Sequence, residues 1–167
     1  MKKILFTAFS VFAFAIAVNA QQGTFRGSVG LAYGFDIEEA GLNIGAEYLF
    51  TDEISAAPSF TTFFVGDGLS YNSINIDGKY YFVTDDTLIY GLLGLGIASA
   101  EFEFTIFDPF TGSTITFEDD DSDTGLNFGA GLLHPVSDRI YINGQLKYAT
   151  AFDGQVVFQA GVAVNIN

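Results

Sequence analysis

Alternation of apolar residues with small or polar ones recurs along this chain in segments of about ten residues. Successive side chains of a strand point to opposite faces, so each segment predicts a strand with one apolar face. Clusters of turn-forming residues separate the segments. The eight predicted strands lie near residues 25–33, 42–50, 54–64, 74–82, 88–98, 126–132, 140–148 and 156–166.

The connections between these segments alternate in length. Short connections are predicted at 51–53, 83–87 and 134–139. Longer connections, near 35–39, 65–71, 100–124 and 150–154, fall at the opposite end of the strands. An even number of strands joined in this way predicts an all-β fold, a closed antiparallel up-and-down barrel.

The glycines indicate which face of the barrel points outward. Most of them share the polar face of their strands, as do Gly30, Gly45, Gly94, Gly96, Gly129, Gly131 and Gly161. The interior of an eight-stranded barrel has room only for packed side chains, and glycine beside long polar groups suits it. The other face carries almost no charge, which suits lipid better than water. A transmembrane β-barrel is therefore predicted, and a soluble lipocalin-like barrel with an apolar ligand inside is the alternative.

Residues 1–20 have the pattern of a cleaved signal peptide. Lys2 and Lys3 precede an apolar stretch, and Val18-Asn19-Ala20 supplies small residues for cleavage. The apolar stretch is shorter than the roughly 20 residues of a transmembrane helix. We therefore expect one exported barrel domain over residues 21–167, without disulfides because the chain has no cysteine.

Acidic residues dominate the charge, with 20 Asp and Glu against six Lys and Arg. Nucleic acid is an unsuitable partner for such a chain, because phosphate binding needs clustered basic residues. We expect a monomer as well, because a closed barrel leaves no strand edge that demands a partner.

Aromatic pairs precede two of the predicted short turns, at Tyr48-x-Phe50 and Tyr80-x-Phe82, and each turn contains an aspartate. Such rings are typical of the interface between hydrocarbon and water. With the signal peptide, the alternating segments and the alternating loop lengths, the whole mature chain resembles small outer-membrane β-barrel proteins of the OmpA and OmpX type. The resemblance implies a porin-like barrel in the cell outer membrane of a Gram-negative envelope, in contact with lipid and lipopolysaccharide.

Five charged residues fall on the inward face of the predicted barrel. They are Arg26, Glu47, Asp77, Lys79 and Lys147. A buried charge is tolerated when it is paired, so we interpret the five as an ion-pair network that joins strands and fills the interior. The alternative is a gate in a narrow ion-conducting pore.

The segment between residues 100 and 124 holds acidic residues and no basic one. The acidic residues are Glu101, Glu103, Asp108, Glu118, Asp119, Asp120, Asp121 and Asp123. Alternating apolar residues around them predict an extracellular hairpin that turns near residues 108–112. An EF-hand is excluded, because Thr124 stands where that loop needs glycine and Ala130 where it needs glutamate. Weak binding of divalent cations, bridging to lipopolysaccharide, is an open alternative to a plain solvated loop.

Catalytic residues are sparse in this sequence. His134 is the only histidine and falls in a predicted turn, and the chain offers no cysteine nucleophile and no phosphate-binding loop. We therefore predict a protein without enzymatic activity or cofactor, with a structural or surface-interaction role through its acidic loops.

Overall fold

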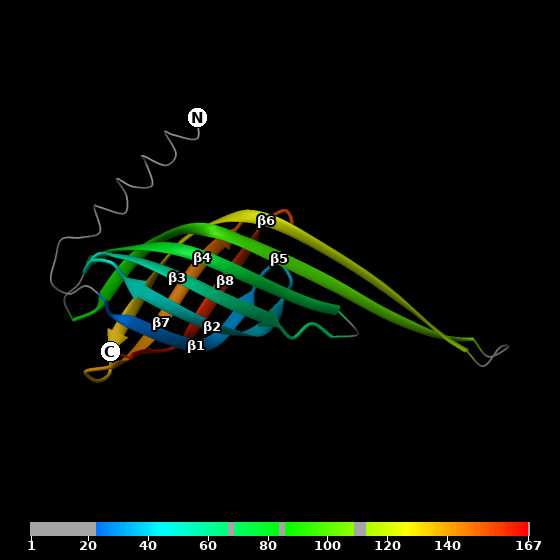
Figure 1. The fold of residues 1–167 in the computed structure, drawn as a ribbon, viewed down its shortest axis with the longest axis horizontal. Helices are drawn as coiled ribbons and strands as arrows, with labels where there is room; N and C mark the ends of the chain where they lie inside the picture. Colours follow the sequence, from blue (N-terminus) through cyan, green and yellow to red (C-terminus); the bar gives the residue numbers. More distant parts are fainter. Residues whose placement is uncertain (1–22, 67–68, 84–85, 109–112, 167) are drawn as a thin grey trace, which may run out of the picture.

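The computed structural model describes residues 23–66, 69–83, 86–108 and 113–166, and at 83, 102–108, 113 and 115–119 it describes the backbone alone. The strands in these ranges follow one another around a closed antiparallel barrel, in which β1 also pairs with β8 (Figure 1). They are β1 (Phe25–Gly34), β2 (Glu39–Leu49), β3 (Ile54–Phe63), β4 (Leu69–Val83), β5 (Leu88–Asp108), β6 (Ser113–Pro135), β7 (Ile140–Ala149) and β8 (Gln155–Asn165). The predicted signal peptide lies outside the described residues.

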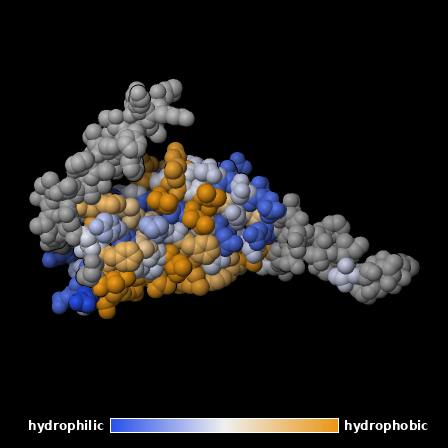
Figure 2. All heavy atoms as spheres, viewed as in Figure 1, coloured by the Kyte–Doolittle hydropathy of each residue, from blue (hydrophilic) through white to orange (hydrophobic). Residues whose placement is uncertain are grey.

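The barrel turns its apolar face outward and its polar face inward. Leu93, Ile76 and Leu31 are each more than 60% exposed, whereas the side chains of Asn127 and Thr61 are 1% exposed in the interior. Hydrophobic residues cover most of the barrel face seen in Figure 2, and hydrophilic residues gather toward its two ends. The transmembrane orientation predicted from the glycines is therefore confirmed. The lipocalin-like alternative is wrong, because the interior, which we call the lumen, is lined mainly by polar groups.

Closure of the barrel depends on glycine where β1 meets β8. Gly30 and Gly161 are opposite each other in this pairing. A Cβ atom at Gly30 would lie 2.5 Å from the carbonyl oxygen of Ala160, and one at Gly161 would meet the backbone of Val29 and Gly30. Backbone atoms of a ladder cannot move aside cheaply, so a larger residue here would push the two strands apart.

Short and long connections lie at opposite ends of the barrel, as predicted. We call the end with residues 50–53 and 136–139 the turn end, and the end with residues 35–38 and 150–154 the loop end. One short turn differs from the prediction. Strand β6 continues through His134 and Pro135, which pair with Ile142 and Tyr141 of β7, so His134 is a strand residue and not a turn residue.

Strands β5 and β6 extend past all other strands at the loop end (Figure 1). Their pairing is continuous from Leu88↔Leu133 to Asp108↔Ser113, so the predicted hairpin is present as an extension of the barrel wall. The strand predicted to end near residue 98 and the strand predicted to begin near residue 126 were therefore both too short. The tip at 109–112 lies outside the described residues. Within the described part of the chain, no helix is both long and apolar enough to cross a membrane.

Candidate functional site

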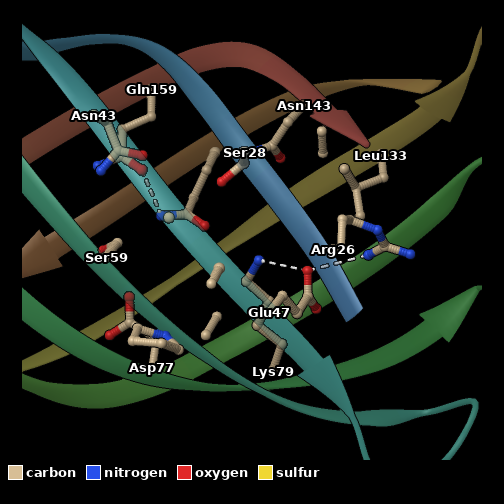
Figure 3. Close-up of a pocket in the computed structure, with 16 residues that line it drawn as sticks. Arg26, Ser28, Asn43, Glu47, Ser59, Asp77, Lys79, Leu133, Asn143 and Gln159 are labelled. Atoms are coloured by element: carbon tan, nitrogen blue, oxygen red, sulfur yellow. Dashed lines mark hydrogen bonds and ion pairs between the residues drawn. The ribbon is translucent and has the colours of Figure 1, made fainter. Parts of the chain in front are cut away.

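Glu47 is the centre of a buried polar cluster at the turn end of the lumen. Its Oε2 atom accepts from Arg26 Nη1 at 3.1 Å and from Lys79 Nζ at 3.3 Å. Its Oε1 atom accepts hydrogen bonds from the hydroxyl groups of Ser55 and Tyr81. Figure 3 shows Glu47 between the two cationic side chains. One carboxylate thus joins β1, β2, β3 and β4 across the lumen.

Strand register brings these residues together. Arg26 of β1 is directly opposite Glu47 of β2, and Lys79 of β4 is directly opposite Ser55 of β3. The rings of Tyr141 and Tyr90 cover the two cations, with centroids 5.0 Å from the Arg26 guanidinium carbon and 4.6 Å from Lys79 Nζ. Cation–π contacts of this kind favour a desolvated cation.

Asp77 and Lys147 form a second charged group, nearer the loop end. Lys147 Nζ lies 3.6 Å from Asp77 Oδ2, and both side chains are almost completely buried. Asn127 donates from Nδ2 to Asp77 Oδ1 at 2.9 Å and to Asn75 Oδ1 at 2.8 Å. The structure therefore gathers the five predicted charges into two groups. Among the described side chains, no ion pair joins one group to the other.

Uncharged side chains that the sequence analysis did not single out connect the middle of the lumen. Gln145 donates to Gln159 at 3.1 Å, and the hydroxyl of Tyr90 lies 3.0 Å from Gln145 Oε1 and 3.1 Å from Asn143 Oδ1. The strand alternation in the sequence does place each of these residues on the inward face. Alternation does not say which inward residues meet, so their contacts were not predictable.

The space left inside the lumen is small. A cavity of about 30 Å³ lies beside Arg26, Glu47 and Lys79, and a second, of about 20 Å³, lies toward the loop end. Each has room for about one or two water molecules. Apolar side chains pack at both ends of the polar region, with Leu92 and Leu133 at the turn end and Phe63 and Val157 at the loop end. We call the two spaces the turn-end cavity and the loop-end cavity.

The acidic residues of the hairpin lie on both of its strands. Glu101 is opposite Asp120, and Glu103 is opposite Glu118. Further register pairs are Phe102↔Asp119, Ala100↔Asp121, Ala98↔Asp123 and Asp108↔Ser113. The side chains of Glu101, Asp120, Asp121 and Asp123 are exposed, and those of Glu103, Asp108, Glu118 and Asp119 lie outside the described ones. Among the described side chains, no three metal-ligating residues form a group that could hold a metal ion.

Asp123 differs from the other acidic residues of the hairpin because it holds a segment of the loop end in place. Its Oδ2 atom accepts a hydrogen bond from the backbone N–H of Phe152 at 2.8 Å, and its Oδ1 atom accepts from Thr124 N–H.

His134, at the other end of the barrel, is exposed, and its Nδ1 atom lies 2.9 Å from Thr87 Oγ1.

The fold is shared with several outer-membrane proteins of known structure. Ail of Yersinia pestis is 21% identical in sequence, with a TM-score of 0.58, covering 86% of this chain and 98% of Ail. A further Ail structure, 22% identical over 86% of this chain and 98% of Ail with the same TM-score, contains the heparin analogue sucrose octasulfate. The N-terminal barrel of Pseudomonas aeruginosa OprF is 18% identical, with a TM-score of 0.62, covering 87% of this chain and 98% of that barrel.

Sequence comparison gives the family directly. No curated protein sequence matches the chain significantly. The family described as the outer membrane protein beta-barrel domain matches residues 4–165, which is nearly the whole chain. This match agrees with the closed barrel and its apolar exterior. The chain therefore belongs to the outer-membrane β-barrel family, and its location is the outer membrane.

Proposed function

We propose that this protein is a non-catalytic, monomeric outer-membrane barrel that acts at the cell surface through its acidic hairpin, residues 100–124. The observation that carries the proposal is the continuation of the β5–β6 pairing beyond the rest of the barrel. In barrels of this class the longer connections face the outside of the cell. The hairpin is then the part of the protein that reaches farthest from the membrane.

The length of the hairpin follows from strand pairing. Phe102 is the last residue of β5 that pairs with β4, and β5 continues to Asp108. At about 3.3 Å per residue, this extension projects about 20 Å beyond the end of β4. On the other side, Asn127 is the last residue of β6 paired with β7. Both flanks of the extension are therefore accessible to a partner.

The charge of the hairpin indicates the kind of partner. Glu101 is directly opposite Asp120 and Glu103 is directly opposite Glu118, and like charges in such positions destabilise a β-ladder. A cationic group that contacts both strands relieves this repulsion. Divalent cations that bridge to the phosphates of lipopolysaccharide are suitable, because carboxylates are hard oxygen ligands. A polyanion such as the heparin analogue bound to Ail is not suitable for this hairpin.

The lumen favours this surface role over ion conduction. The buried groups around Glu47 and Asp77 occupy its middle, and apolar side chains pack at both ends. An ion crossing the barrel would have to displace paired charges, and each broken pair leaves an uncompensated buried charge. We therefore do not propose that the protein is a narrow ion-conducting pore.

Calcium is a direct probe of the hairpin. We expect titration of the purified protein with CaCl2 to release or absorb binding heat, and we expect a triple variant with Glu101→Gln, Asp120→Asn and Asp121→Asn to lose most of it. All three side chains are exposed, so the variant should fold normally. The measurement is isothermal calorimetry at constant ionic strength.

A matched control removes three carboxylates from the turn end. Asp52→Asn, Asp86→Asn and Asp138→Asn change the net charge by the same amount and affect exposed side chains far from the hairpin. This control should bind calcium like the wild type. Absence of heat in the wild type, or equal heat in both triple variants, would refute binding at the hairpin.

A further inference from the structure

Four buried side-chain atoms of the described residues make no hydrogen bond, and all four belong to residues that line the loop-end cavity. They are Asn127 Oδ1, Lys147 Nζ, Gln155 Nε2 and Gln159 Nε2. Buried polar atoms in folded proteins almost always have a hydrogen-bond partner. Their concentration around one cavity points to a ligand of that cavity. Three of the four are N–H donors, which favours an electron-rich ligand over a cation.

The balance of buried charge supports the same conclusion. Among the described residues the buried cations are Arg26, Lys79 and Lys147, and the buried anions are Glu47 and Asp77. In their usual ionised forms, these five residues sum to one positive charge. A buried charge is stable when it is paired, and one bound anion would neutralise the interior.

Lys147 is the cation with the weakest partner inside the protein. Its Nζ atom lies 3.6 Å from Asp77 Oδ2, beyond hydrogen-bond distance. Asp77 instead accepts a hydrogen bond from Asn127 at 2.9 Å. In contrast, Arg26 and Lys79 both bind Glu47 at shorter distances. The ammonium group of Lys147 thus has N–H donors available on the wall of the loop-end cavity.

The size and cover of the cavity limit the anion. A volume of about 20 Å³ admits one or two particles of water size. Sulfate, phosphate and carboxylates are too large for this space. Phe63, Tyr71 and Val157 line the cavity toward the loop end and pack in one apolar cluster, so a bound ion would have little contact with solvent.

We propose that the loop-end cavity binds a single monatomic anion of the halide class. Lys147 Nζ supplies the charge, and Gln155 Nε2 and Gln159 Nε2 supply neutral N–H donors. The bound anion would connect β7 with β8, which contribute these three residues. The site is separate from the hairpin and depends on none of its residues.

Bromide is the probe for a crystallographic test, because its anomalous scattering distinguishes it from water. We expect crystals of the wild-type protein grown with NaBr in place of NaCl to show an anomalous peak in the loop-end cavity, in contact with Lys147 Nζ. The peak should disappear in Lys147→Met and persist in Asn143→Ala, which changes the turn-end cavity only. Bromide at surface positions alone, or water in the cavity, would overturn the proposal.

A solution measurement covers the case in which Lys147→Met does not fold. The unfolding temperature of the wild type should rise more with chloride than with gluconate at equal ionic strength, because the gluconate carboxylate is too large for the cavity and a ligand of the folded state stabilises it by mass action. Gln155→Leu keeps the lysine and should reduce the chloride effect, whereas Asn143→Ala should preserve it. Equal unfolding temperatures in chloride and gluconate for the wild type would contradict the site.

Discussion

Replacing Glu47 with alanine is expected to lower the free energy of unfolding by about 3–5 kcal/mol, the usual cost of removing one partner from a buried ion pair. The carboxylate is the shared partner of Arg26 and Lys79, whose side chains are 4% and 9% exposed. Without it, both cations stay buried and repel each other. Denaturant unfolding of the protein in lipid vesicles, followed by tyrosine fluorescence, measures the loss.

Two further variants separate charge from other effects of the Glu47 substitution. Glu53→Ala removes an exposed carboxylate from a nearby turn and should change stability by no more than about 0.5 kcal/mol. Glu47→Gln retains an oxygen that can accept from Ser55 and Tyr81 but lacks the charge, and it should show most of the loss seen with alanine. If Glu47→Ala were as stable as Glu53→Ala, the cluster would not contribute to the stability of the barrel.

Substituting Gly161 with valine is expected to destabilise closure of the barrel by about 3 kcal/mol or more, because the added atoms overlap a neighbouring backbone. The Cβ atom would collide with Val29 and Gly30 in β1. These atoms belong to the β1–β8 pairing, so relief requires the ladder itself to separate. Heat-modifiable migration in gel electrophoresis reports this change, since only a closed barrel stays compact in detergent before heating.

Gly144→Val provides the matched control for the closure prediction. Gly144 also lies in a strand, but the nearest neighbour of an added Cβ would be the side chain of Leu132, at 3.9 Å. The variant should therefore migrate like the wild type before and after heating. A normally closed barrel in Gly161→Val would show that the pairing of β1 with β8 has room for a larger side chain, contrary to the structure.

Strand alternation was sufficient to predict which face of the barrel each residue occupies. Arg26, Glu47 and Lys79 were placed in the lumen because every second residue of their strands is apolar and faces outward. The pairing of the charges was not predictable. Alternation leaves the register between strands open, and register decides that Lys79 contacts Glu47 while Lys147 lies nearest Asp77.

Strand ends were harder to predict than strand faces. Aspartate, and to a lesser degree glutamate, is depleted in strands, so β5 was expected to end near Ala98, before the acidic segment. In the structure, pairing between the two strands continues to Asp108 and Ser113. The barrel already aligns β5 with β6, and their pairing therefore continues through a segment of unfavourable charge.

We infer that the lumen is filled and that the protein acts through its exterior. Planar-bilayer recording tests the filled lumen most directly, with protein whose heat-modifiable migration shows a closed barrel. We predict that the wild-type protein inserts without producing discrete conductance steps in KCl, because the groups around Glu47 and Asp77 and the apolar clusters block the passage. Reproducible single-channel steps from the wild-type barrel would contradict the claim.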